Sequence, residues 1–247
     1  MTYFLASCIR ANEEIFQALS IPFSDEYLEM GDIGAGGDRI SGLDAFAEGV
    51  FVKHLSEYGQ IESEESGSIG EYRVTKIVID PIDGSSNALS YIPYFGTSVA
   101  RVIDGVVDVA VVCNMANGEI LFKDKDGAVM EGKVFRDRTD PIIVSATPKI
   151  GIFEQAYNHP KLSKALMDSG LKFRSMGALA LSLAYAHRVD YVLFMGTQRE
   201  YDVVAGLALC DGLEKIVTDD YVIVSRSRET AQTIEGLIKS TQTKEIE

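Results

Sequence analysis

The stretch VIDPIDGSSN, residues 78–87, carries the strongest signal in the chain. Asp80 and Asp83 lie three residues apart, and Pro81 between them fixes φ and stiffens the backbone. Two carboxylates held this close repel each other, so either a cation compensates them or one takes a proton. Oxygen ligands at this density suit Mg²⁺, with Mn²⁺ as an alternative, and the Ile82 carbonyl is a further candidate ligand. The spacing does not fit an EF-hand, which needs acids at its first, third and fifth positions.

The small residues that follow, Gly84, Ser85, Ser86 and Asn87, leave their backbone amides exposed. If a helix begins here, its first amides and its dipole point toward an anion such as phosphate. The alternative is that Ser85 and Ser86 only cap a helix. The two interpretations are compatible, so capping does not exclude a phosphate site.

A second acidic cluster lies upstream, where residues 62–65 read Glu-Ser-Glu-Glu. A run of charges is usually a solvated face, and this is the plain interpretation of Glu62, Glu64 and Glu65 taken alone. Together with Asp80 and Asp83, however, the run favours a shared metal site.

Composition limits the classes of partner. The 247 residues are 46% hydrophobic and 24% charged, as in ordinary soluble globular proteins. The formal net charge of −14 excludes general attraction to nucleic acid or to anionic membranes. The chain has no run of about 18 apolar residues, so no membrane span is expected. The N-terminus is too charged for a signal peptide. Cys8, Cys113 and Cys210 are scattered in apolar runs, which predicts buried thiols in a reducing cytoplasm.

Helical spacing of apolar residues predicts helices over 3–19 and 42–58. Between them, residues 31–39 hold four glycines and predict a mobile, functional loop. A β-branched run over 74–79 predicts a strand that ends at Asp80. Further strand-like runs cover 96–104, 106–113, 119–123 and 128–130, separated by the turns Asp104-Gly105, Asn117-Gly118 and Asp126-Gly127. Three such turns in order predict an antiparallel meander.

After residue 141 the pattern alternates between helix and strand. Helices are expected over 160–169 and 178–187, from near Asp202 and from about 228; strands are expected over 172–176, 189–195 and 222–226.

At this point the motifs resemble a known family. DPIDGSSN with SEES upstream is similar to the Mg²⁺-dependent phosphatase superfamily that contains inositol monophosphatases and fructose-1,6-bisphosphatases. Three more pieces resemble family elements in family order: Gly37–Asp44 of the glycine loop, Arg174–Ala178, and Tyr201–Gly206 at the start of a late helix.

The resemblance implies a role for each matching residue. Implied metal ligands, for two or three Mg²⁺ ions, are Glu64, Asp80, the Ile82 carbonyl, Asp83 and Asp202. Implied catalytic residues are Ser85 with Asp38 or Asp44, which would orient the attacking water. Implied substrate-binding residues are Asp83, Gly84, Ser85, Ser86, Gly177 and Ala178, and Arg199 is a further candidate that matches no family motif. Glu65 matches an assisting glutamate of the bisphosphatases.

Two departures bear on the substrate. Met195 stands where inositol monophosphatases usually carry a glutamate that contacts inositol hydroxyls. The segment 196–201 is short compared with bisphosphatases, where it helps to bind the second phosphate, and Arg199 is the candidate replacement. The expected function is a phosphatase acting on inositol or sugar phosphates. The alternatives are a fructose-1,6-bisphosphatase, alone or combined with that activity, and a non-catalytic relative that senses a phosphorylated metabolite or binds a partner.

The resemblance also implies the fold, a layered αβαβα sandwich. We expect an N-terminal α+β half, residues 1–140, with most metal ligands, and a C-terminal α/β half, residues 141–247, that supplies Asp202. The site should lie between the halves. The expected partners are a small phosphate ester and a second copy of the chain, with no nucleic acid and no membrane.

Overall fold

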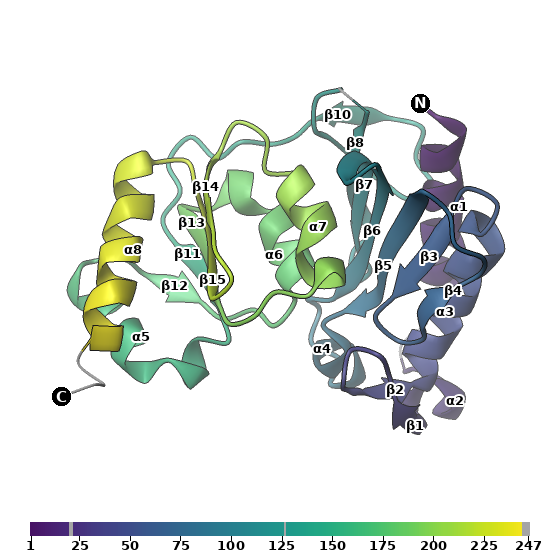
Figure 1. Cartoon of the computed structure of the whole chain (residues 1–247), viewed down its shortest axis with the longest axis horizontal. Coiled ribbons are helices and arrows are strands. Elements are labelled where there is room, and N and C mark those ends of the chain that lie inside the picture. The colour runs from purple at the N-terminus through teal and green to yellow at the C-terminus, as the bar shows by residue number, and fades with distance from the viewer. Residues whose placement is uncertain (20–21, 126, 244–247) are drawn as a thin grey trace.

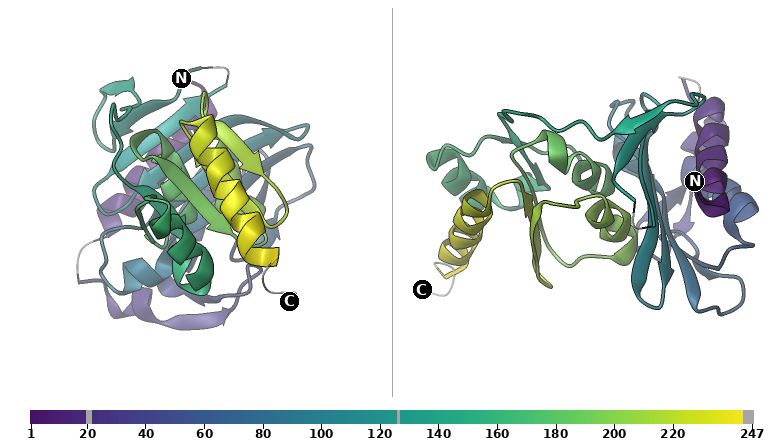
Figure 2. Two further views of the ribbon diagram at one scale, coloured as in Figure 1. Left: turned by 90° about the vertical axis from the view of Figure 1, so that its left-hand side faces the viewer. Right: turned by 90° about the horizontal axis from the view of Figure 1, so that it is seen from above.

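The computed structural model describes residues 1–19, 22–125 and 127–243. Five layers follow one another across the longest axis of the molecule (Figure 1). A helical layer, a large sheet, a second helical layer, a smaller sheet and a third helical layer are stacked in this order. The αβαβα sandwich expected from the resemblance is therefore confirmed, and the view from above shows the same stacking (Figure 2).

The large sheet has eight strands in the described part of the chain, and all neighbours are antiparallel except β3 and β5. In spatial order they are β10 (Thr139–Pro141), β9 (Met130–Lys133), β8 (Glu119–Asp124), β7 (Val106–Asn114), β6 (Gly96–Ile103), β5 (Thr75–Asp83), β3 (Gln60–Ser63) and β4 (Gly67–Ile69). The predicted meander is β6 to β9. Its first turn has positive φ at Asp104 and Gly105, as tight hairpin turns require, whereas Asp126 of the third turn lies outside the described residues.

The smaller sheet mixes parallel and antiparallel pairs. In spatial order its strands are β12 (Phe173–Arg174), β11 (Gly151–Glu154), β13 (Tyr191–Met195), β15 (Tyr221–Ser225) and β14 (Glu214–Val217). The sequence did not predict β11 or β14. β11 is only four residues long, and β14 is a mostly exposed edge strand that opens with two charged residues, so neither shows a clear period.

Helices cover both sheets. The outer layer of the large sheet holds α1 (Tyr3–Ala18), α3 (Gly42–Leu55) and the short α2 (Asp25–Leu28). The middle layer holds α6 (Leu179–Ala184) and α7 (Glu200–Ala208). The far layer holds α5 (Pro160–Asp168) and α8 (Arg228–Thr243). Short 3₁₀ turns lie at Ala156–Asn158 and Ala186–Arg188. Within the described residues, no helix has both the length and the apolar composition to cross a membrane.

The core is formed by the apolar faces that the periodicity predicted. Leu5, Cys8 and Ile15 of α1 and Leu43 and Phe51 of α3 are fully buried against the large sheet. Burial of side chains of this size contributes about 1.5–3 kcal/mol each. All three cysteines are buried free thiols, as expected.

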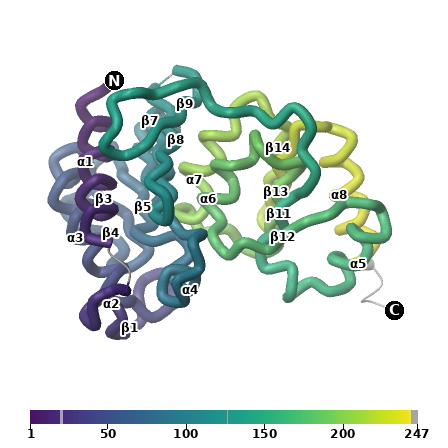
Figure 3. The backbone as a smooth tube through the Cα atoms, turned by 180° about the vertical axis from the view of Figure 1, so that it is seen from behind, coloured from purple at the N-terminus to yellow at the C-terminus, as the bar shows by residue number. Residues whose placement is uncertain are grey.

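The glycine-rich segment forms a hairpin. Its two strands, β1 (Met30–Ile33) and β2 (Arg39–Ser41), pair antiparallel, and three of the four glycines lie in the turn between them. The hairpin and α4 (Ser85–Leu89) lie at the same end of the large sheet, as the view from behind also shows (Figure 3). The sequence predicted an irregular loop because four glycines hide the short pairing pattern.

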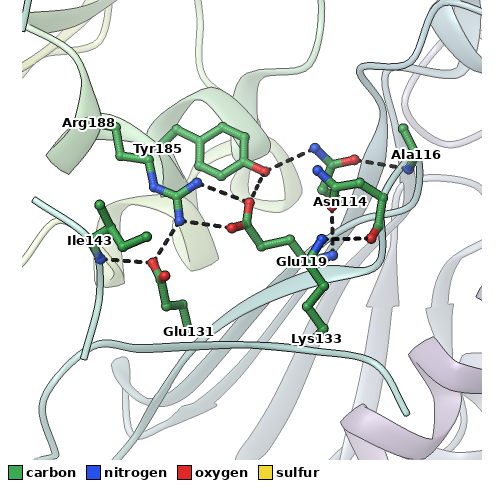
Figure 4. A network of polar contacts seen from close by, with 9 residues as sticks. Asn114, Ala116, Glu119, Glu131, Lys133, Ile143, Tyr185 and Arg188 are labelled. Atoms are coloured by element: carbon green, nitrogen blue, oxygen red, sulfur yellow. Dashed lines mark hydrogen bonds and ion pairs between the residues drawn. The ribbon is translucent and has the colours of Figure 1, made fainter. Parts of the chain in front are cut away.

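A polar network joins the large sheet to the middle helical layer (Figure 4). We call Asn114, Glu119, Glu131, Tyr185 and Arg188 the junction network. Arg188 donates two hydrogen bonds of 3.0 Å to the Glu119 carboxylate and one of 2.7 Å to Glu131. The Tyr185 hydroxyl donates to Glu119 at 2.5 Å and accepts from Asn114 at 3.0 Å. These contacts tie three strands of the large sheet, β7, β8 and β9, to Tyr185 and Arg188, which follow α6.

Candidate metal centre

Two parallel strands bring the first two acids together. β3 pairs with β5 in register Ser63 to Ile79, and the Glu64 amide donates to the Ile79 carbonyl at 3.2 Å. Because both strands run in the same direction, Glu64 and Asp80 emerge at the same edge of the sheet. The parallel pairing was not predicted; it is the tertiary reason why the two acidic clusters of the sequence meet.

The third acid comes from the other half of the chain. Asp202 lies in the first turn of α7, next to β5. Carboxylate oxygens of Glu64, Asp80 and Asp202, one from each, lie within 4.8 Å of one another. We call these residues the acidic triad. They can together hold a metal ion, and they are three of the ligands expected from the sequence.

Burial makes the acidic triad costly without a cation. The pKa of Asp80 is well above its ordinary value because the side chain is buried and the charges of Glu64, Asp83 and Asp202 are close. Burial also raises the pKa of Glu64 to about 7, because the nearby Arg199 offsets only part of the effect of burial and of the neighbouring acids.

One oxygen of the triad has no partner. Asp80 is 2% exposed, and its Oδ1 makes no hydrogen bond with any residue that the structure describes. A buried, unsatisfied carboxylate oxygen costs about 1–3 kcal/mol or more. The carboxylate oxygens of the acidic triad are hard donors, and a site built from them fits Mg²⁺ or Mn²⁺.

Asp83 lies beyond an irregularity in the strand. β5 does not end at Asp80, as predicted, but continues to Asp83 with a shift in its pairing to β6. The Asp83 Oδ2 accepts a hydrogen bond of 2.7 Å from the Leu181 amide of α6. Burial raises the pKa of Asp83 to about 8 despite that bond, with Glu154 and Asp202 adding to the rise.

Ser85 contacts one of the two predicted water-orienting acids. Its hydroxyl lies 2.9 Å from both Asp44 Oδ1 and the Ile82 carbonyl. Asp44 is buried and caps α3 through Ser41, whereas the side chain of Asp38 is 88% exposed on the hairpin. The structure thus brings Asp44, and not Asp38, into contact with Ser85.

The capping interpretation of the two serines is wrong. The N-cap of α4 is Gly84, and no side chain caps this helix. Gly84 has a φ of 90°, and a Cβ there would lie 2.9 Å from the Gly177 carbonyl and 3.0 Å from Ala178. Only glycine permits this approach, which brings the predicted substrate residues Gly177 and Ala178 against the start of α4.

Sequence reasoning missed Glu154. This buried residue at the end of β11 accepts hydrogen bonds from the Gly177 amide at 2.7 Å and from the Ser182 hydroxyl at 2.5 Å. It therefore holds the segment from Gly177 onward in place. A glutamate that ends an apolar strand was the available signal, but the short strand itself was not detected.

The site residues described above line one cavity of about 990 Å³. Its wall includes the acidic triad, Asp38, Asp44, Glu65, Asp83, Gly84, Ser85, Ser86, Gly177, Ala178, Met195 and Arg199. Burial raises the pKa of Glu65 to about 8, with Asp44 and Glu64 contributing. The structure thus gathers the site residues expected from sequence around a single space between the halves.

Comparison with known proteins agrees with this geometry. The model of the inositol monophosphatase family matches residues 2–233. The chain belongs to the inositol monophosphatase family. A relative named Nus factor SuhB, from Escherichia coli strain K12, is 31% identical over 194 residues, covering 74% of this chain and 72% of the relative. An inositol-1-monophosphatase of Mesorhizobium japonicum is 30% identical over 196 residues, covering 74% and 73%.

Solved structures of other proteins share the fold. The SuhB protein of Bartonella henselae superposes with a TM-score of 0.77 at 22% identity, covering 96% of this chain and 98% of that chain. The MJ0109 gene product, described as an inositol monophosphatase-fructose 1,6 bisphosphatase, gives 0.78 at 20% identity, covering 96% and 100%.

Proposed function

We propose that the protein is a divalent-metal-dependent phosphatase that hydrolyses a small phosphate monoester, most simply an inositol or sugar phosphate. The observation that carries the proposal is the acidic triad with the unpaired Asp80 oxygen, located beside Ser85 in the cavity. Family membership points to the same reaction class.

Glu64, Asp80 and Asp202 would hold the first ion, and Asp83 with the Ile82 carbonyl would extend the ligand set. We propose Mg²⁺, with Mn²⁺ as a substitute, in two or three sites. When bound, such ions lower the pKa of a coordinated water and neutralise phosphate oxygens.

The chain itself supplies orientation and proton handling. Asp44 holds the Ser85 hydroxyl in place, and the two together would align the attacking water. The amides of Gly84, Ser85 and Ser86 donate no hydrogen bond to another residue of the described chain, and they would donate to the ester phosphate. Phosphoryl transfer needs mostly position and charge from the protein, and no covalent intermediate is required. Glu65, whose pKa is about 8, would exchange a proton with water near neutral pH.

The identity of the released alcohol is the open part of the proposal. Met195 and Phe194 line the cavity where a glutamate would favour inositol hydroxyls. Arg39 and Arg199 on the same wall could attract a second anionic group, which favours fructose 1,6-bisphosphate as the alternative or additional substrate.

Phosphate release across a substrate panel tests the proposal. The panel contains inositol 1-phosphate, fructose 1,6-bisphosphate, glycerol phosphates and nucleotide 3′-phosphates, each with an excess of Mg²⁺ and with EDTA. We expect turnover of at least one ester that is lost in EDTA. Metal-independent release, or no release from any ester, would contradict the assignment.

A second candidate is a non-catalytic member of the inositol monophosphatase family that senses a phosphorylated metabolite or binds a partner. The relatives named Nus factor SuhB favour it. Binding of panel esters in calorimetry without phosphate release would support this candidate. We further propose that the protein acts as a homodimer in the cytoplasm; a monomer in sedimentation velocity would overturn the first part.

A further inference from the structure

Arg199 places its guanidinium on two members of the acidic triad. Its Nε donates to Asp202 Oδ2 at 2.8 Å, and its Nη2 lies 3.2 Å from Asp202 Oδ1 and 3.0 Å from Glu64 Oε1. Asp202 is therefore held in a bidentate fork, the strongest geometry for an arginine and a carboxylate. The sequence suggested Arg199 as a substrate-binding residue. In the structure its guanidinium instead contacts two of the acids that would bind a metal.

The same guanidinium also holds the glycine hairpin. Its Nη1 donates to the Gly36 carbonyl at 2.8 Å and lies 3.7 Å from Asp38. The turn is tightly seated, because a Cβ at Gly36 would lie 2.7 Å from the Glu64 Cγ. Arg199 thus links the hairpin turn to two of the acids that would bind a metal.

The compensation that Arg199 provides is incomplete. Burial disfavours a charged guanidinium, but the hydrogen bonds and charges of Asp202 and Glu64 outweigh burial and raise the pKa of Arg199. The arginine is therefore always cationic. It makes no contact with Asp80, whose buried Oδ1 stays unpaired among the described residues. The guanidinium therefore pairs with two of the three carboxylates of the triad, and the third carboxylate has no cationic partner in the described part of the chain.

We propose that Arg199 is a built-in counter-cation that competes with divalent ions for Glu64 and Asp202, and that its displacement by the ion frees the hairpin turn at Gly36. The inference deepens the proposed function and rests on it in one respect, the presence of a divalent site at the acidic triad.

Electrostatics makes shared occupation unfavourable. A divalent ion on the triad would lie within a few ångströms of the guanidinium, where two cations repel strongly in a half-buried site. The guanidinium occupies both carboxylate oxygens of Asp202 and one of Glu64, and a metal on the triad would need oxygens of the same two carboxylates. The Arg199 side chain is 37% exposed, so a route to solvent is open for it.

Metal affinity is the first test. Mn²⁺ binding is measured by the loss of the free-ion signal in electron paramagnetic resonance, for the wild type, Arg199→Met and Arg39→Met. Arg39→Met is the matched control, because it removes the same charge from the cavity wall but its guanidinium contacts only the Met30 and Gly31 carbonyls. We expect Arg199→Met to bind Mn²⁺ at least tenfold more tightly, and Arg39→Met to change affinity less than threefold.

A second variant, Arg199→Lys, keeps the proposal testable if Arg199→Met does not fold. Arg199→Lys keeps the charge but loses the planar fork, and we expect an intermediate gain of about two- to fivefold. Equal or weaker Mn²⁺ binding in the folded variants would overturn the proposal.

Displacement itself is visible in the wild type. The Nε–H resonance of Arg199 is assigned by its absence from the spectrum of Arg199→Lys, and Mg²⁺ is then titrated. We expect this resonance to shift and its exchange with water to accelerate as the ion binds. If Mg²⁺ binds while the resonance stays unchanged, Arg199 remains on Asp202 and the inference is wrong.

The two proposals fail in different ways. If the wild type binds no Mn²⁺ and Asp80→Asn behaves identically, the proposed metal site fails. If the wild type binds Mn²⁺ and Asp80→Asn loses that binding, but Arg199→Met binds as the wild type does, only the counter-cation is wrong.

Discussion

The molecule contains two clusters in which one arginine meets several acids between the large sheet and the middle helices, and they differ in balance. In the junction network, Arg188 reaches both Glu119 and Glu131, and Tyr185 adds a further donor. In the acidic triad, Arg199 pairs with two of the three acids, Glu64 and Asp202. The third, Asp80, keeps a buried oxygen that is unpaired among the residues that the structure describes.

The pKa values move in opposite directions. Burial favours the neutral form of Glu119, but the bonds from Arg188 and Tyr185 outweigh it, so the pKa of Glu119 is lowered. In the triad, burial and neighbouring acids prevail and the pKa values of Glu64 and Asp80 are raised. In the junction network both carboxylates are hydrogen-bonded to Arg188, whereas in the triad the Asp80 carboxylate keeps this unpaired oxygen, which can accept a cation.

The largest expected effect is on turnover in Asp80→Asn. The variant replaces the central carboxylate of the triad by a neutral amide. Because a metal contact of this kind contributes several kcal/mol, we expect kcat/KM to decrease on the order of 10³-fold. Phosphate release on the best ester of the panel measures it. Retention of wild-type turnover would remove the triad from the mechanism.

Stability should move oppositely in the two clusters. Without divalent ions, Asp80→Asn relieves repulsion and its melting temperature should equal or exceed that of the wild type. The matched change Glu119→Gln weakens the hydrogen bonds that Glu119 accepts from Arg188 and Tyr185, and it should lower the melting temperature. Equal shifts of the same sign in calorimetry would break the comparison.

The next effect is on folding in Arg188→Met. Removing the arginine leaves Glu119 and Glu131 without their cation, and because these pairs are partly buried the cost should lie between about 1 kcal/mol, as for exposed pairs, and about 3–5 kcal/mol, as for buried ones. Urea denaturation should show this loss in the free energy of unfolding. A loss below about 1 kcal/mol would place Arg188 with ordinary surface ion pairs.

A smaller effect is expected in Ser85→Ala. The hydroxyl links Asp44 to the Ile82 carbonyl, and its loss leaves the attacking water poorly oriented. We expect kcat to decrease about 10- to 100-fold with little change in KM. A change confined to KM would mean that Ser85 binds substrate without orienting the water.

The last effect is the dependence of stability on pH. The ordinary pKa values of Glu64 and Asp83 are 4.5 and 3.8, and the fold raises them to about 7 and about 8. The folded protein then binds more protons than the unfolded chain, so stability falls as pH rises from about 4 to about 8. The loss should appear as a steady decrease in melting temperature over this pH range when EDTA is present.

Adding Mg²⁺ should counter this decrease, because the ion binds the ionised carboxylates and binding is stronger at higher pH. Melting curves at pH 6 and pH 8, each with Mg²⁺ and with EDTA, measure both slopes. A larger stabilisation by Mg²⁺ at pH 6 than at pH 8 would contradict the assignment of these groups.

The sequence alone determined much of this protein. Apolar periodicity placed most helices and the meander, because those signals are local. The Asp80–Asp83 spacing and the acids at 62–65 predicted a cation site, because close carboxylates need one wherever they lie. Family motifs extended this to Asp202 and Ser85, and the structure brings both to the same cavity.

Only the tertiary structure decided how these pieces work together. Parallel pairing of β3 with β5 places Glu64 beside Asp80, and packing of α7 on the large sheet adds Asp202. Neither contact has a local signal, since each joins segments distant in the chain. The position of Arg199 on Glu64 and Asp202 likewise depends on that packing. Local sequence patterns therefore predicted the candidate ligands, and long-range packing set the charge balance between them.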